Sequence, residues 1–173
     1  MPDPAHPLTL WFARACVVLY ALALLIYVCD LDSTSPRFKL WRVIWSAACL
    51  FLIVHVLSAF HLEHGWSHAA AIRHTAEQTA RVTGIDWSGG LYFNYAFVIM
   101  WGLDVGNLWR SPPSGRSILR RTTDLACLFM IFNATIVFGP KWWIGPVAAF
   151  GLIAFLLRRR VSVANNHDRT SEG

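Results

Sequence analysis

Residues 8–28, LTLWFARACVVLYALALLIYV, decide the fold class, because they form a nearly continuous apolar run with a single charged side chain, Arg14. An α-helix rises about 1.5 Å per residue, so about 20 mostly apolar residues cross the roughly 30 Å hydrocarbon core of a bilayer. This run is therefore long enough to be a transmembrane helix.

The rest of the chain repeats this pattern. Four further apolar stretches are expected to span the membrane: Leu40–Phe60, Gly90–Leu108, Arg121–Phe138 and Trp142–Leu157. The 173 residues are 55% hydrophobic and only 14% charged, whereas globular chains are about 45–50% apolar and about 25% charged. This composition argues against a soluble domain and against a disordered chain.

We therefore expect an all-α fold, a polytopic transmembrane helix bundle of about five spans. Residues 1–160 would form one bundle, and the polar residues 161–173 a disordered cytoplasmic tail. The spans leave no room for a separate soluble domain.

The distribution of Lys and Arg predicts the orientation, because cytoplasmic loops retain positive charge. With the N-terminus outside, eleven of the fifteen basic residues fall on the cytoplasmic side. Residues 1–7, MPDPAHP, carry no Lys or Arg, so the first span is predicted to be an uncleaved anchor and not a secretory signal peptide. This pattern is typical of a bacterial inner-membrane protein with a cytoplasmic C-terminus. Topology and anionic lipid account for the net charge of +5, without a nucleic-acid partner.

Aromatic residues agree with this orientation, since Trp and Tyr gather at the headgroup level. Trp41, Trp45 and Trp109 are expected at inner span ends. Near them, Asp104 and Asp124 are expected to form ordinary interfacial ion pairs, for which the candidate arginines are Arg110, Arg120 and Arg121.

Histidine is concentrated in residues 55–84, HVLSAFHLEHGWSHAAAIRHTAEQTARVTG, which contain five of the seven histidines. Ala, Glu, Gln and Arg predominate after Trp66, and Gly84 stands at a plausible C-cap. The second helix is therefore predicted to extend beyond the outer face. An unbroken helix would be about twice as long as the membrane is thick, so a bend near Gly65 or an interfacial second half is expected.

On a helical wheel, His61, His64 and His68 fall within about 60° of one another, whereas His55 and His74 point elsewhere. Imidazole is a common ligand of copper, zinc and iron, and histidines three or four apart on a helix can converge on one ion. The spacing thus indicates a transition-metal site (Cu, Zn or Fe) at the outer face. All three could bind one ion only if the helix distorts near Gly65. Otherwise two would bind it.

The histidine stripe also has a structural interpretation, because polar side chains at heptad spacing can form hydrogen bonds with neighbouring helices. In this alternative the chain is a non-catalytic structural or accessory subunit of a membrane complex. Its partners would be the lipid bilayer and other membrane subunits or a second copy. The sequence indicates no substrate and no catalytic residue. An enzyme would need a second catalytic group, and only Glu63, Asp86 and Tyr95 are in reach for that role.

Overall fold

The computed structural model describes residues 6–28, 36–110 and 118–171, and every regular element in these ranges is helical. The elements are α1 (Pro7–Val28), α2 (Pro36–Leu62), α3 (His68–Thr83), α4 (Gly90–Arg110), α5 (Ile118–Phe132), the π-helical turn η1 (Asn133–Val137), the 3₁₀ turn η2 (Lys141–Trp143) and α6 (Ile144–Ser171). The prediction of an all-α fold is confirmed.

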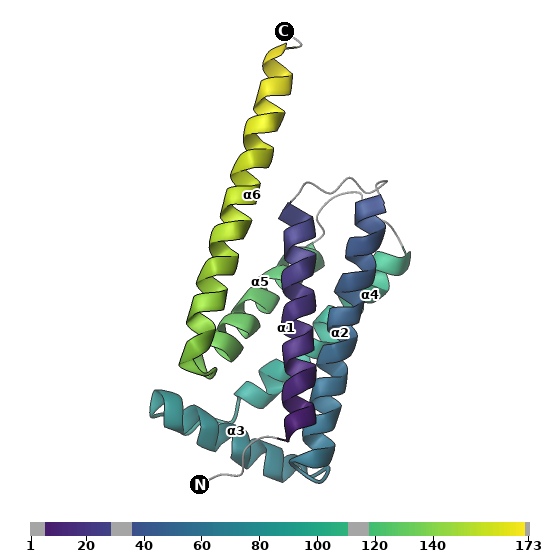
Figure 1. The fold of residues 1–173 in the computed structure, drawn as a ribbon. Helices are drawn as coiled ribbons and strands as arrows, with labels where there is room; N and C mark the ends of the chain where they lie inside the picture. The colour runs from purple at the N-terminus through teal and green to yellow at the C-terminus, as the bar shows by residue number, and fades with distance from the viewer. Residues whose placement is uncertain (1–5, 29–35, 111–117, 172–173) are drawn as a thin grey trace.

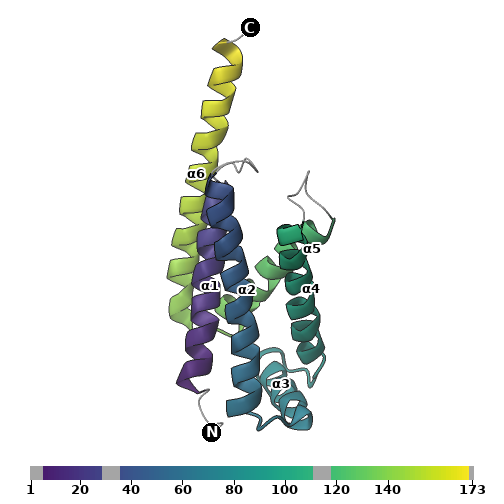
Figure 2. The ribbon, with the colours of Figure 1, turned by 90° about the vertical axis from the view of Figure 1, so that its right-hand side faces the viewer.

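The long helices α1, α2, α4, α5 and α6 alternate in direction along the bundle, as Figure 1 shows. The N-terminus lies at the end occupied by α3, and the C-terminus lies at the opposite end. Helix α3 runs across the bundle end, roughly perpendicular to α1 and α2, which the quarter-turn view confirms (Figure 2). The most extensive helix contact joins α1 to α2.

Aromatic side chains fill the core between α1, α2 and α4. Trp45 and Trp101 are 2% and 1% exposed, and their ring centroids are 4.8 Å apart. Tyr20 joins them from α1, with its ring centroid 5.9 Å from that of Trp45. Ala23 and Ala48 are fully buried, and such small side chains let two helices approach closely.

This core corrects one expectation of the sequence. Trp41 and Trp45 were expected in the interfacial belt, but both are buried, at 4% and 2% exposure. A tryptophan near a helix end fits a headgroup layer and a helix contact equally well, and only the position of α1 and α4 distinguishes the two environments.

Three segments are long and apolar enough to cross a membrane: Pro7–Val28, Pro36–Leu62 and Lys141–Arg160. A bundle of five spans is therefore not confirmed by length and composition. Helix α4 has 21 residues but contains Asn94, Asp104 and Asn107, which lower its hydropathy. Helix α5 has only 15 residues before η1 begins.

The turn η1 marks the end of the fourth predicted span. Asn133 donates its side-chain N–H to the carbonyl of Phe129, at 2.7 Å, within the same helix. At Gly139 a Cβ atom would collide with the carbonyl oxygens of Ala134 and Thr135, so glycine permits the chain to fold back closely here. The α-helical hydrogen bonding thus stops at Phe132, and η1 continues the helical path to Val137, close to the predicted end at Phe138.

The predicted bend near Gly65 is confirmed as a break between α2 and α3. Gly65 and Trp66 both have positive φ, 53° and 62°. Ser67 caps α3 by accepting a hydrogen bond from the backbone N–H of Ala70 at 3.2 Å. Gly84 ends α3 with φ 76°, in the left-handed conformation that favours glycine.

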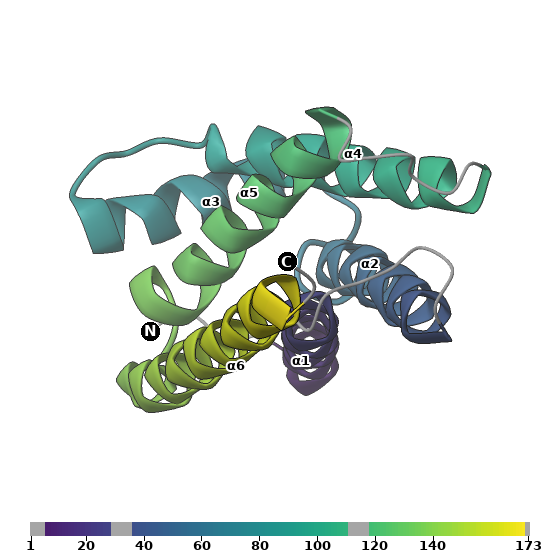
Figure 3. The ribbon, with the colours of Figure 1, turned by 90° about the horizontal axis from the view of Figure 1, so that it is seen from above.

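In the view from above, helix α6 lies at the edge of the bundle, beside α1 and α5 (Figure 3). It continues to Ser171 and so runs through most of residues 161–173, for which a disordered tail is expected. No glycine or proline lies between Leu152 and Glu172 to stop it.

Candidate functional site

The three histidines predicted as metal ligands lie at the same end of the bundle but on separate elements. His61 belongs to the last turn of α2, His64 lies in the turn that follows, and His68 is the first residue of α3. The three histidines therefore do not form a stripe on one continuous helix, because the chain turns at Gly65 and Trp66 and α3 runs across the end of the bundle.

Two of these histidines engage different aromatic partners. Trp66 donates its indole N–H to Nδ1 of His61 at 3.1 Å. The Nδ1 atom of His68 shares a hydrogen bond with the Tyr95 hydroxyl at 3.1 Å, and the two rings stack with centroids 5.9 Å apart. His61 thus stabilises the turn, whereas His68 ties α3 to α4.

His64 pairs with His74, which contradicts the expectation that His74 points away. Their ring centroids are 5.2 Å apart. The helical-wheel prediction is wrong for His64 and His74 because the break at Gly65 places α3 beside the turn and not in line with α2. Burial and the neighbouring His74 lower the pKa of His64, against the opposing effect of the Glu63 carboxylate. His64 is therefore harder to protonate than an ordinary histidine. The side-chain oxygen Oε1 of Glu63 is buried and has no hydrogen-bond partner among the described residues.

Within residues 6–28, 36–110 and 118–160, no three His, Cys, Asp or Glu side chains lie close enough together to hold a metal ion. The geometry of the described side chains therefore lends no support to a ready-made site at His61, His64 and His68, and a site for Cu, Zn or Fe stays a prediction. His55 has a different role: its Nδ1 atom contacts the Thr9 carbonyl oxygen at 3.0 Å and so links α2 to α1.

A second group of polar side chains lies in the core, toward the other end of the bundle. Arg120 of α5 forms an ion pair with Asp104 of α4, with Nη1 and Oδ2 2.6 Å apart. Trp45 of α2 donates its indole N–H to the same carboxylate oxygen at 3.0 Å. Asp104 is only 4% exposed, so this pair lies inside the bundle and not at its surface. The expected pairing of Asp104 with arginine is confirmed for Arg120, but its interfacial setting is not.

Asp124 binds the same guanidinium, with Nη2 of Arg120 and Oδ1 3.2 Å apart. The guanidinium carbon also lies 3.9 Å from the ring centroid of Trp45 and 4.5 Å from that of Trp41. A desolvated cation over an aromatic face contributes about 2 kcal/mol. Arg120 thus links α2, α4 and α5 through charge and ring contacts together.

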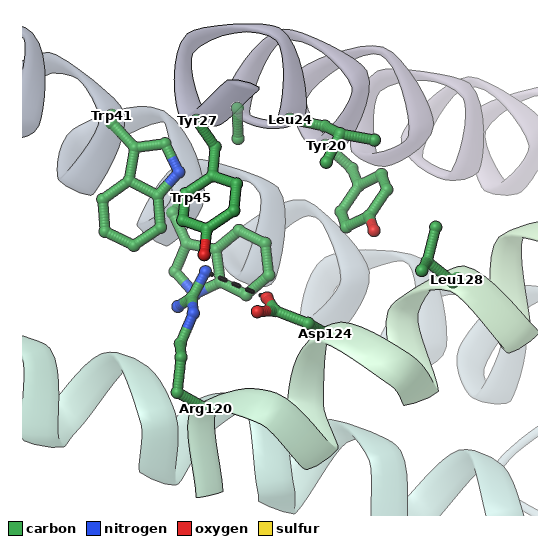
Figure 4. Close-up of a pocket in the computed structure, with 9 residues that line it drawn as sticks. Tyr20, Leu24, Tyr27, Trp41, Trp45, Arg120, Asp124 and Leu128 are labelled. Carbon is green, nitrogen blue, oxygen red and sulfur yellow. Dashed lines mark ion pairs between the residues drawn. The ribbon is translucent and has the colours of Figure 1, made fainter. Parts of the chain in front are cut away.

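A cavity of about 160 Å³ opens beside this cluster, between α1, α2 and α5 (Figure 4). Its walls are mainly aromatic and apolar, and Arg120 and Asp124 provide charge at one side. The lining residues are Tyr20, Ala23, Leu24, Tyr27, Trp41, Trp45, Arg120, Asp124 and Leu128. A concave apolar site with a few convergent polar groups is the usual form of a small-molecule site.

Sequence reasoning missed this cavity although its spacings are visible. Trp41 and Trp45 are four residues apart, and so are Arg120 and Asp124, so each pair shares one helix face. The spacing does not say which helix faces which, and that information comes only from the fold. No family model, no curated protein and no solved structure matches this chain, so its function must be argued from these two groups of residues.

Proposed function

We propose that this chain is an integral protein of the bacterial inner membrane with five crossings, and that it serves as a structural or accessory subunit of a membrane complex. Its N-terminus would lie outside and its C-terminus in the cytoplasm. The three long apolar segments support insertion into a bilayer. The alternating helix directions give an odd number of passes, so the two ends of the chain would lie on opposite sides (Figure 1).

The position of α4 beside α2 supports the two further crossings. Toward the middle of α2, the indole N–H of Trp109 donates to the Ser46 hydroxyl at 2.9 Å. Near the end of α2, the rings of Phe60 and Tyr95 have centroids 6.0 Å apart. Helix α4 therefore lies alongside α2 from Ser46 to Phe60, which supports a crossing by α4.

The same kind of contact supports a crossing by α5. Its Arg120 and Asp124 lie at the depth of Trp45 and Asp104, in the half of the bundle where α2 begins. From there α5 and η1 run obliquely back toward the end occupied by α3, and α6 starts before that end is reached (Figure 2). The polar residues that lower the hydropathy of these helices are partly satisfied inside the bundle, as Asp104 is.

The observation that supports the subunit function is the exposure of the apolar side chains of α6. Within the span Lys141–Arg160 no residue of the most apolar window is buried, whereas α1 and α2 each bury several residues. Large side chains such as Leu152, Ile153 and Phe155 are at least half exposed. A span that contributes so little to its own bundle is available for a second chain in the membrane plane.

Site-specific photocrosslinking in cells tests this function. A photoreactive residue at Leu152 or Phe155 in α6 is expected to give a protein adduct of one discrete mass. The matched control is Val18 in α1, which is 53% exposed and should crosslink mainly to lipid. Only lipid adducts at both α6 positions, together with a monomeric mass in mild detergent, would contradict the subunit function.

A transition-metal site at His61, His64 and His68 is the second candidate function. The observation in its favour is that two imidazoles, those of His64 and His74, already lie with ring centroids 5.2 Å apart near a buried Glu63 oxygen, and of these two only His64 belongs to the predicted set. Neutral imidazole is the form that binds Cu, Zn or Fe. A small movement of the turn would be needed to bring a third ligand to the pair.

Elemental analysis of the detergent-purified protein tests the metal site. We expect near-stoichiometric copper, zinc or iron that is lost when His61, His64 and His68 are all replaced by alanine. His6→Ala is the matched control, since His6 lies at the start of α1 and hydrogen-bonds the backbone of Leu8. Equal metal content in the triple variant and the parent chain would exclude this site.

A further inference from the structure

We propose that His64 and His74 together bind one divalent transition-metal ion, Cu²⁺ or Zn²⁺, beside the carboxylate of Glu63. The inference rests on the second candidate function, a transition-metal site at the end of the bundle where α3 lies, but it assigns different ligands. Only His64 is shared with the set predicted from the sequence, and His74 takes the place of His61 and His68.

The break at Gly65 brings the two imidazoles together from different elements. His64 lies in the turn after α2, and His74 lies in the middle of α3. Their ring centroids are 5.2 Å apart, and the ring planes are inclined at 59°. An ion bound tetrahedrally to one nitrogen of each ring, at about 2.1 Å, places the two centroids roughly 5 Å apart. The observed separation is therefore close to the one that a shared ion requires.

The ring of His74 is held from one side by Gln78. The side-chain nitrogen of Gln78 lies 2.8 Å from Nε2 of His74, which is four residues earlier on α3. In metal sites the imidazole nitrogen that does not bind the ion usually makes a hydrogen bond of this kind, which orients the ring. A glutamine amide can present its nitrogen or its oxygen, so it can also accept from Nε2 when Nδ1 binds the ion. Gln78 is thus a positioning residue of this site.

The buried carboxylate oxygen of Glu63 favours a cation at this place. Oε1 of Glu63 is buried and has no hydrogen-bond partner among the described residues. A buried charge without a partner costs free energy, and a nearby cation offsets that cost. The carboxylate acts electrostatically on His64, so it lies near the imidazole pair. Glu63 therefore compensates one of the two charges of the ion.

The surroundings of His64 favour a metal ion over a proton. Burial and the neighbouring His74 both lower the pKa of His64. Metal ions bind the deprotonated imidazole, so a lowered pKa reduces the competition from protons. The Nδ1 atoms of His61 and His68, in contrast, already make hydrogen bonds to other side chains.

The site would be open and not a closed structural centre. No three His, Cys, Asp or Glu side chains lie close enough together to hold an ion within residues 6–28, 36–110 and 118–160. The two imidazoles would therefore be the ligands from the protein, and water would occupy the other positions. Such positions are open to an external ligand, as they are in catalytic zinc sites.

Titration of the full chain in detergent with copper(II) chloride, followed by electron paramagnetic resonance, tests the ligands. The first equivalent of Cu²⁺ should show hyperfine coupling to two imidazole nitrogens. His64→Ala and His74→Ala should each weaken binding at least about tenfold and remove one nitrogen. Glu63→Gln keeps the size of the side chain and should weaken binding severalfold. The controls His61→Ala and His68→Ala should change neither the affinity nor the number of nitrogens.

Equal affinity in His74→Ala and the parent chain would overturn this ligand set. If copper is lost in His61→Ala or His68→Ala and kept in His74→Ala, the second candidate function survives with its original ligands and this inference fails. No copper binding by the parent chain would contradict both. If His74→Ala does not fold, His74→Gln decides instead, because it keeps a polar side chain on α3 but removes the imidazole.

Discussion

Arg120 links three helices in the half of the bundle where α2 begins. Its guanidinium contacts Asp104, Asp124 and the ring of Trp45, which belong to three helices. Burying an ion pair gains little net free energy, but removing one partner leaves an uncompensated charge inside the fold. The charged residues and the helices that contain them could be predicted from the sequence. That their side chains meet in the core could not.

Asp104→Asn should therefore destabilise the protein strongly. We expect a loss of about 3–5 kcal/mol in the free energy of unfolding, the usual cost of breaking a buried pair, measured by denaturant titration in mixed micelles. The exposed pair Glu77–Arg81, 3.5 Å apart on α3, is the matched control. Arg81→Gln should cost no more than about 1 kcal/mol, and equal losses in the two variants would show that the core pair has no special weight.

His64 should titrate at lower pH than an ordinary histidine. Burial is the largest cause of its lowered pKa, and His74 is the second. Because the unfolded chain then binds the proton more readily than the folded one, stability falls as the pH drops below the ordinary value of 6.5. An NMR titration of the histidine ring resonances measures the pKa of His64 directly.

The variant His74→Ala separates the two causes of that shift. It should raise the pKa of His64 part of the way toward its ordinary value, since desolvation remains, whereas His6→Ala should not change it. A pKa of His64 that is unaffected by His74→Ala would mean that the two rings do not meet as described.

At the scale of the elements, the break between α2 and α3 determines where the histidines lie. The sequence predicts it correctly from Gly65 and from the length of an unbroken helix, because glycine adopts positive φ without strain. The consequence for His74 was not predictable, since the direction of α3 after the turn depends on its contact with α4. Figure 2 shows α3 lying against the end of the bundle.

Two glycine substitutions should have effects of opposite sign. Gly65→Ala places a Cβ atom at φ 53° and should cost about 1–2 kcal/mol. Gly102→Ala lies inside α4, where a Cβ meets no other atom, and should stabilise the chain by about 0.5–1 kcal/mol. The shift of the thermal unfolding midpoint in detergent measures both, and a stabilising Gly65→Ala would contradict the turn geometry.

At the scale of the whole molecule, composition predicts an all-helical fold and insertion into a membrane, and it leaves the number of crossings open. Hydropathy counts α1, α2 and residues 141–160 as spans. It does not count α4, whose mean hydropathy Asp104 lowers, although in the bundle that carboxylate is bound by Arg120 and Trp45. A hydropathy average over the residues of one helix contains no information about partners on other helices.

The most direct test of the five-crossing bundle is to measure, in intact cells, from which side of the membrane each end of α4 is accessible. In a chain whose four native cysteines are replaced by alanine, Asp86→Cys precedes α4, and Arg110→Cys is its last residue. A membrane-impermeant maleimide should label the cysteine at position 86 from outside and the one at position 110 only after the membrane is permeabilised. Labelling of both positions from outside in intact cells would show that α4 does not cross, and would contradict the five-crossing bundle.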